Sequence, residues 1–318
     1  MFLGESILKE LVLKKVLEAN TDKCAVFHTL YKDSNKFFPF DCNEIVDNFM
    51  ECVPENSAYF MYDNSNLIGG FTLNENTINF PFMVTPFNDR NEFWKVVLEF
   101  AVHKSMNKEI TLNRISEIDS NELVNSYNAI LKYSIRRMYR PTEQFTITLN
   151  ENFYFDVMEE KDKAEITKII FEAHSNGYTT TAWELEENES DNEIKNEIEQ
   201  DVEKWFASFK NKNSLFMINI VKSKNDNKIA GVCITGIYPN SLEYSTANFA
   251  TIHEISVKPI YQRNGIAKAM MLKAISEASV ISPIITLGVL IGNPSEILYK
   301  KLGFLPGSSY YELIYKIS

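Results

Sequence analysis

The stretch "VKPIYQRNGIAKAMM", residues 257–271, joins an expected strand to an expected helix. The alternating run "NFATIHEISV" precedes it, and Pro259, which has no backbone N–H, ends the strand ladder. At the start of the helix, Gly265 has no Cβ to obstruct a ligand, and Ala267 is also small. Free N–H groups at a helix start attract anions, so this stretch predicts an anion-binding turn.

The second half of the chain is predicted to follow the order β-α-α-β-β-β-α-β-α-β. Period-2 runs indicate its strands, and apolar residues spaced three or four apart indicate its helices. A single glycine, late in this order and after hairpin-type strands, argues against the G-x-G-x-x-G dinucleotide fold. The expected strands are residues 152–157, 214–221, 228–238, 248–257, 283–291 and 310–317; the expected helices lie within 162–174, an acidic run ending near 205–209, 265–279 and 293–304.

The first half repeats this pattern in a weaker form. The segment "VTPFNDRNEFWK" aligns with "VKPIYQRNGIAK" at an offset of 173 residues, and "MYRPTEQF" aligns with "GFLPGSSY" at an offset of 165. Two matches in the same order indicate a duplication. We therefore expect an α/β fold of two tandem domains, residues 1–149 and 150–318, each with a mixed, mostly antiparallel twisted sheet of about six or seven strands flanked by helices. The expected elements of the first half are strands at 57–62, 67–73, 77–84 and 109–115, a helix at 91–104 and a helix ending near residue 137.

Composition restricts the class of protein. The net charge of −11 opposes binding to a nucleic-acid backbone. The four cysteines have no Cys-x-x-Cys spacing, which predicts neither a metal site nor a disulfide framework. The first 20 residues are predicted to form an amphipathic helix rather than a signal peptide, and no apolar run is long enough for a membrane span. We expect a cytoplasmic protein without nucleic-acid or membrane partners.

Two motifs together resemble the GNAT superfamily of N-acetyltransferases. The first is V-x-P-x-x-Q-x-x-G-x-A at residues 257–267, and the second is N-x-x-x-x-x-Y-x-K-L-G-F at residues 293–304. The resemblance covers about residues 152–318 and implies a tandem member with acetyl-coenzyme A as cosubstrate and no metal.

The resemblance also implies which residues hold the coenzyme. The turn's backbone amides match those that bind the pyrophosphate, the strand before it matches the one that flanks the pantetheine arm, and Asn293 matches a position that contacts the same arm. The residues implied are Ile255, Ser256, Val257, Gln262, Arg263, Asn264, Gly265, Ile266, Ala267, Lys268 and Asn293.

Acetyl transfer to an amine needs a base for the amine and an acid for the departing thiolate. Tyr299 matches the family tyrosine that protonates this thiolate. By strict alternation, His253 shares a face with Ile255 and Val257, and Glu254 lies on the opposite face. His253 and Glu254 both remain candidates for the base, because a bulge in this strand would change the faces.

The acceptor is expected to contact residues 174–183 and 238–244, with Tyr178 and Trp183 as aromatic candidates. His174 has no partner pattern and is interpreted as a structural or surface residue. In the first half, Asp89, Glu92 and Trp94 replace Gln262, Gly265 and Ala267 at the 173-residue offset, and this predicts a degenerate domain that binds no coenzyme.

The sequence therefore predicts an N-acetyltransferase that moves an acetyl group directly from acetyl-coenzyme A to a primary amine of a small molecule or peptide. The alternative is a non-catalytic protein that binds acyl-coenzyme A or regulates a partner. A monomer and a homodimer are equally compatible with the sequence.

Overall fold

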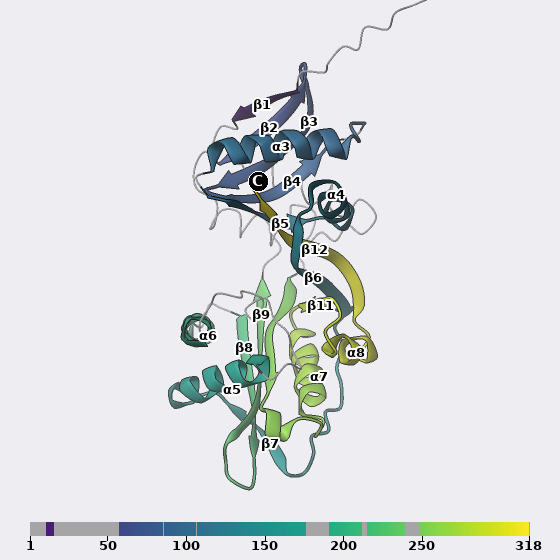
Figure 1. Ribbon diagram of the computed structural model, residues 1–318. Coiled ribbons are helices and arrows are strands. Elements are labelled where there is room, and N and C mark those ends of the chain that lie inside the picture. Colours follow the sequence, from purple (N-terminus) through teal and green to yellow (C-terminus); the bar gives the residue numbers. More distant parts are fainter. Residues whose placement is uncertain are drawn as a thin grey trace, which may run out of the picture. The chain divides into compact units, whose positions relative to one another are not determined.

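The computed structural model describes residues 11–15, 57–84, 86–105, 107–175, 191–211, 215–238 and 248–317. The chain divides into two compact units, and Figure 1 shows their elements. The first unit consists of Met1–Ser134 with Ser308–Ser318, and the second of Ile135–Gly307. We describe each unit separately.

The second unit contains a six-stranded sheet with the order β6-β11-β10-β9-β8-β7. Every described pair in it is antiparallel except β10 with β11. The elements follow the predicted order closely. They are β7 (Phe153–Val157), α5 (Lys163–Ser175), α6 (Asp191–Lys210), β8 (Leu215–Ser223), β9 (Ile229–Tyr238), β10 (Phe249–Val257), α7 (Ile266–Ala278), β11 (Ile284–Leu290) and α8 (Ser295–Lys301), with short 3₁₀ turns at Glu160–Asp162 and Pro259–Tyr261.

Helices cover both faces of this sheet. Helix α7 packs against β8, β9, β10 and β11, and its Met270 and Ile275 belong to one buried cluster with Ile252 and Ile285. Helices α5 and α6 pack against each other over the opposite face, where Ile170 and other apolar residues form a second cluster. The two layers are visible on either side of the strands in Figure 1. The sheet thus separates an α7 face from an α5/α6 face.

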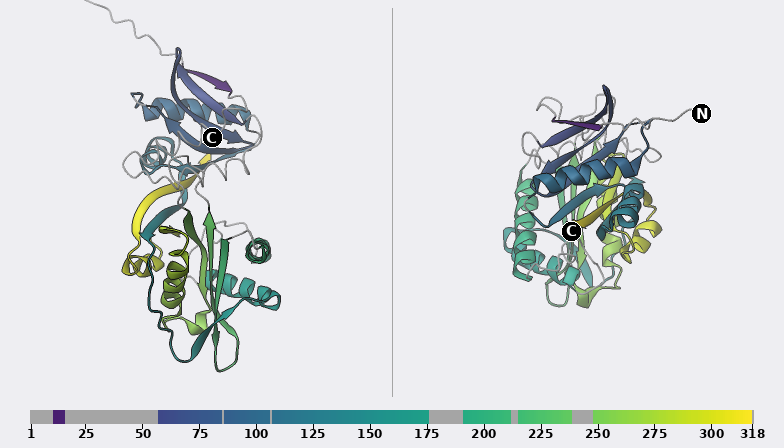
Figure 2. Two further views of the ribbon diagram at one scale, coloured as in Figure 1. Left: turned by 180° about the vertical axis from the view of Figure 1, so that it is seen from behind. Right: turned by 45° about the horizontal axis from the view of Figure 1, so that its top comes forward.

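The first unit repeats this arrangement with the order β1-β2-β3-β4-β5-β12, and only β4 with β5 is parallel among its described pairs. Helix α3 lies across the strands, and the apolar side of α3, including Trp94 and Val97, is buried against them (Figure 2). Its elements are β1 (Leu11–Lys15), β2 (Ala58–Asp63), β3 (Asn66–Asn74), β4 (Thr77–Met83), α3 (Arg90–Lys104), β5 (Glu109–Ile115), α4 (Glu117–Tyr127) and β12 (Leu305–Lys316).

Two helix predictions in the first half are wrong. Residues 11–15 form strand β1, which pairs with β2, so sheet pairing outweighs the helical periodicity there. The helix expected to end near residue 137 already ends at Tyr127, because Asn128 takes a left-handed conformation at its C-terminus. Residues Ile130–Pro141 instead form strand β6.

The last strand of the chain belongs to the first unit. Strand β12 pairs with β5, and its Leu313 is fully buried in the first unit's core. Conversely, β6 from Ile135 onward pairs with β11 in the second unit. The two compact units thus do not coincide with the residue ranges 1–149 and 150–318. The division into domains at those residues stays a prediction. The alignment of "MYRPTEQF" with "GFLPGSSY" at an offset of 165 does not match equivalent positions either. It aligns the end of β6 with the start of β12.

Candidate active site

A bulge interrupts strand β10 at the predicted catalytic residues. Its ladder with β9 shifts between Ile252, which pairs with Thr235, and Glu254, which pairs with Ile234. His253 is the extra residue between them. A bulge re-aims side chains, and here it does so in the middle of the sheet.

Because of the bulge, His253 and Glu254 lie on the same face. Ile252 and Ile255 both belong to the cluster on the α7 face. Glu254 contacts His174 of α5, and the His253 ring stacks on Phe216, so both side chains lie on the α5/α6 face. The prediction from strict alternation, which placed His253 and Glu254 on opposite faces, is therefore wrong.

The parallel strands β10 and β11 diverge at the bulge. Their ladder joins Ala250, Thr251 and Ile252 to Ile285, Thr286 and Leu287 and extends no further among the described residues. Strand β11 continues to pair with β6 as far as Leu290. Backbone groups on the β11 side of residues 254–257 therefore have no partner in that ladder, although the β9 side stays paired. An extended ligand can take up these groups as an added strand does.

The predicted anion-binding turn leads into α7. Gly265 is the N-cap, with φ of 78°, and no side chain caps the helix. A Cβ at this position would meet nothing within 4 Å, so the space above the helix start is open. Arg263 also has a left-handed conformation, with φ of 65°. Consecutive N–H groups at such a turn form a concave anion site.

Side chains around the turn separate into anchors and exposed groups. The Gln262 amide donates to the Val257 carbonyl at 3.2 Å, and the Asn264 amide donates to the Tyr261 carbonyl at 3.1 Å. Both hold the loop in shape. Ile266 is buried in the core, whereas Arg263 and Lys268 are exposed cations beside the helix start. Asn293 accepts a hydrogen bond from the Ser295 N–H at 2.8 Å at the start of α8.

Glu254 is a buried carboxylate with two polar partners. His174 Nε2 lies 3.2 Å from its Oε2, and the Ser256 hydroxyl donates to its Oε1 at 2.7 Å. Burial alone raises the pKa of Glu254, but the charge and hydrogen bond of His174, together with hydrogen bonds from Ser256 and the Ile255 backbone, outweigh it. The pKa is lowered, so the carboxylate is ionised at neutral pH. The interpretation of His174 as an unpartnered structural or surface residue missed this contact, since residues 80 apart in sequence carry no common pattern.

His253 has a different environment. His253 is exposed, with the Phe216 ring stacked on its imidazole, and its Nε2 lies 2.7 Å from the Tyr238 hydroxyl. Desolvation lowers the pKa of His253 to about 4, the nearby Arg137 charge lowers it further and Glu254 opposes both. The imidazole is thus neutral at neutral pH.

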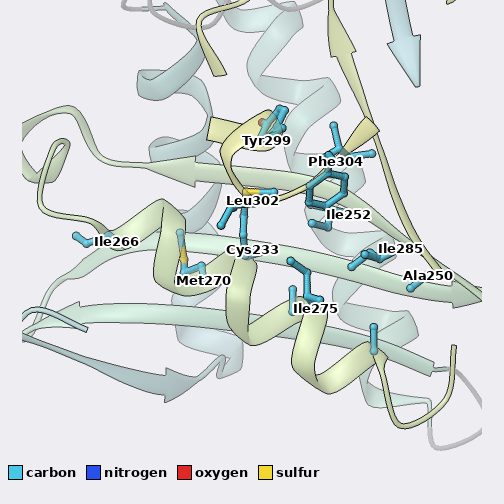
Figure 3. Close-up of a cluster of buried hydrophobic side chains, with 14 of the residues drawn as sticks. Cys233, Ala250, Ile252, Ile266, Met270, Ile275, Ile285, Tyr299, Leu302 and Phe304 are labelled. Atoms are coloured by element: carbon cyan, nitrogen blue, oxygen red, sulfur yellow. The ribbon is translucent and has the colours of Figure 1, made fainter. Parts of the chain in front are cut away.

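Tyr299 lies on α8 in the cluster of the α7 face, near Cys233 and Leu302 (Figure 3). Burial is the largest cause that raises its pKa, with the Glu254 charge acting in the same direction. The phenol therefore keeps its proton at neutral pH. Burial also raises the pKa of the free Cys233 thiol to about 12, in agreement with an inert, reduced cysteine.

Comparison with known proteins bears on the fold of the chain. Residues 178–304, less than half of the chain, match the model of the acetyltransferase (GNAT) family. Solved structures match nearly the whole chain. The chain has the GNAT fold.

Three of these structures are informative. A GCN5-related N-acetyltransferase from Sphaerobacter thermophilus has a TM-score of 0.64 at 12% identity, with 96% of each chain covered. A tandem GNAT protein from the clavulanic acid biosynthesis pathway has a TM-score of 0.61 at 9% identity and covers 97% of this chain and 99% of its own. A GNAT acetyltransferase from Colwellia psychrerythraea has a TM-score of 0.54 at 12% identity, with 96% and 99% covered. No curated protein sequence matches the chain.

Several expectations lie outside the described residues. Tyr178 and Trp183 fall there, as does most of the two expected acceptor segments, except His174, Ser175 and Tyr238. Within the described ranges, no group of three or more His, Cys, Asp or Glu side chains is arranged to hold a metal ion. Nor does any helix there have the length and apolar character to cross a membrane.

The turn before α3 in the first unit is built differently. Asp89 is the N-cap of α3, and its carboxylate accepts a hydrogen bond from the Glu92 N–H at 3.0 Å. Trp94 does not stand at the turn surface, as the 173-residue offset suggested: it is fully buried, and its indole donates to Asp119 at 3.1 Å. The helix N-caps, Asp89 and Gly265, are 176 residues apart, so α3 begins about one turn earlier than α7 in the aligned sequence.

Proposed function

We propose that the second unit is an N-acetyltransferase that moves an acetyl group from acetyl-coenzyme A to a primary amine of a small molecule or peptide by direct transfer. The observation that carries the proposal is the divergence of β10 from β11 at a bulge, directly before a helix whose start is uncapped. The thioester would lie between the two diverging strands, and the phosphates of the coenzyme would lie at the uncapped start of the helix.

The described residues fit the cosubstrate. Backbone N–H groups of Gly265, Ile266, Ala267 and Lys268 would bind the pyrophosphate, with Arg263 and Lys268 near enough to add charge. The pantetheine arm would lie along the β11 side of residues 254–257, where the Val257 carbonyl already accepts from Gln262. The Ser256 hydroxyl is engaged with Glu254, and its backbone pairs with Val232 of β9. Asn293 shapes the start of α8 on the other side of the opening.

In the reaction, the amine nitrogen attacks the thioester carbonyl, the C–N bond forms and the C–S bond breaks. The nitrogen loses a proton to a base, and the leaving thiolate takes one from an acid. Tyr299 holds a proton at neutral pH and is the proposed acid.

His253 is the proposed base. Glu254 is ionised but both of its oxygens are engaged, by His174 and Ser256. The imidazole of His253 is neutral and exposed on the same face, and its Nε2 has one partner named above, the Tyr238 hydroxyl. Its lowered pKa makes it a weak base, which suits proton removal after attack, because the nitrogen of the tetrahedral intermediate is far more acidic than the free ammonium.

The test is release of free thiol from acetyl-coenzyme A in the presence of a panel of primary amines, with the acetylated product identified by mass. We expect His253→Ala and Tyr299→Phe each to lower kcat by about 10²-fold, while affinity for the coenzyme is retained. Coenzyme binding without amine-dependent release, unchanged by both variants, would instead support a non-catalytic acyl-coenzyme A binding protein.

We further propose that the first unit binds no coenzyme, because Asp89 caps its helix with a carboxylate at the position of the expected phosphate. Calorimetric titration should give one coenzyme per chain. A stoichiometry of two would refute this.

A further inference from the structure

Aromatic side chains from three elements surround the His253 imidazole. Phe216 of β8 stacks on it with centroids 5.5 Å apart and planes 8° apart. Tyr238 of β9 meets it edge-on at 5.7 Å, and Trp205 of α6 lies at 6.3 Å. These separations lie within the range of favourable aromatic pairs. We call Trp205, Phe216 and Tyr238 the aromatic cluster.

A glycine makes room for this cluster. A Cβ at Gly236 would lie 2.8 Å from His253 Nε2, 2.9 Å from Phe216 Cζ and 3.0 Å from Tyr238 Cε2. These distances are too short for ordinary contact. Gly236 has no left-handed backbone conformation that would otherwise call for glycine. The absence of a side chain there allows the rings to converge on the imidazole.

The cluster is at the edge of the core rather than inside it. Trp205 and Phe216 pack against the apolar cluster of the α5/α6 face, yet all three rings stay partly exposed. Buried packing alone therefore does not account for them. The rings lie on the face to which the bulge directs His253, which is opposite the face covered by α7.

The charges near the imidazole do not favour a cation. Arg137 and Glu254 are the charged groups that act on His253 in the described part of the chain. The Glu254 carboxylate is already paired with His174, whereas Arg137 lowers the pKa of a neighbouring base. A polycationic acceptor would meet more of this repulsion than an acceptor with a single amine.

We propose that the acceptor is a primary amine carried by a planar aromatic group that stacks against Trp205 and Phe216, with the amine directed at His253. This inference rests on the proposed acetyl transfer and names its substrate class. Aromatic rings stack on flat faces with more affinity than saturated rings of equal size, so recognition by the cluster discriminates planarity as well as apolar surface.

The test compares matched amines in the thiol-release assay with the full chain. 2-Phenylethylamine and 2-cyclohexylethylamine differ only in the planarity of the ring, and spermidine represents the polycationic class. We expect a KM about fivefold lower for 2-phenylethylamine than for 2-cyclohexylethylamine, and a higher KM for spermidine than for either. Equal KM values for the two ring amines, or preference for spermidine, would overturn the inference and leave the proposed acetyl transfer standing.

Two variants and a control locate the preference. Trp205→Leu and Phe216→Leu keep apolar volume but remove the flat faces, so each should reduce the preference to about twofold or less. Phe209→Leu, one turn further along α6, is the control and should preserve it; Phe209 pairs with Phe206 instead. Thermal melting checks that all three fold.

Binding by saturation-transfer NMR separates the two proposals. Selective binding of 2-phenylethylamine to the complex with coenzyme A, with no thiol release from acetyl-coenzyme A for any amine, would refute acetyl transfer while retaining the aromatic class. A preference unchanged in both Trp205→Leu and Phe216→Leu would refute the role of the cluster.

Discussion

In each unit the two parallel strands diverge after a short ladder, but different side chains lie beyond the point of divergence. In the first unit, Thr77 and Ile78 pair with Thr111 and Leu112 before the ladder ends; in the second, the pairs begin at Ala250 and Ile285. Beyond this point the first unit places the Arg114 guanidinium over the rings of Phe80 and Tyr310, each 5.4 Å away. These side chains occupy the equivalent of the proposed thioester site.

The second unit has smaller or polar groups at the corresponding positions. When the first pair of each ladder is aligned, Thr77–Thr111 with Ala250–Ile285, His253 corresponds to Phe80 and Gly288 to Arg114. A Cβ at Gly288 would touch only Ile135 Cγ2, at 3.5 Å. The same backbone is thus closed by its own side chains in one unit and left open in the other. Divergence of two parallel strands alone therefore does not make a ligand site.

The largest effect is expected in the closed unit. Trp94→Ala removes a fully buried indole and leaves Asp119 without one donor, so the free energy of unfolding should fall by about 3–5 kcal/mol. Coenzyme affinity of the second unit should stay unchanged. Urea denaturation and calorimetry measure the two quantities, and a large loss of affinity would contradict the division of roles.

Gly288→Arg tests the open unit by giving it the side chain of the closed one. The guanidinium should fill the divergence and lower coenzyme affinity about 100-fold, or about 3 kcal/mol, in calorimetry. Gly288→Ala is the matched control, because its Cβ makes only ordinary contact. Wild-type affinity in Gly288→Arg would show that the arm does not pass this point.

A smaller effect is expected from the Glu254 pair. Because the folded-state pKa of Glu254 is lowered, its stabilising contribution is complete above the ordinary carboxyl range and is lost as pH falls through the lowered value. Glu254→Gln should therefore cost about 1–3 kcal/mol at pH 7, and this cost should shrink as the pH falls below the ordinary carboxyl range. Melting temperatures of both proteins from pH 7 to pH 3 should converge; a constant difference would exclude the ionised pair as its source.

The smallest effect concerns His253. NMR titration of its ring should give a pKa of about 4, well below that of an unperturbed imidazole. Arg137→Gln removes the charge that lowers it, so the pKa should rise, by less than about one unit. An unperturbed value in the wild-type protein would contradict the crowded environment of the ring.

Local patterns in the sequence predicted most elements of the second unit. The strand, turn and helix at residues 248–279 appear within one residue of the predicted positions, because alternation, proline and glycine act locally. The faces of His253 and Glu254 were not predictable from alternation, since a bulge depends on pairing with β9. The contact of His174 with Glu254 and the convergence of Trp205, Phe216 and Tyr238 depend on tertiary packing, which no spacing encodes.

The strand exchange has a consequence for synthesis of the chain. The ribosome makes most of the first unit before the second, yet Leu313, a core residue of the first unit, is made after residues 135–307 of the second. Domains usually fold in the order in which they emerge. Here the unit that emerges first is completed last, after residues 135–307 have supplied every strand of the other sheet. A nascent chain that stops short of β12 would thus carry a finished candidate catalytic unit and an unfinished partner, whose exposed strand edge is a site for chaperone binding or aggregation.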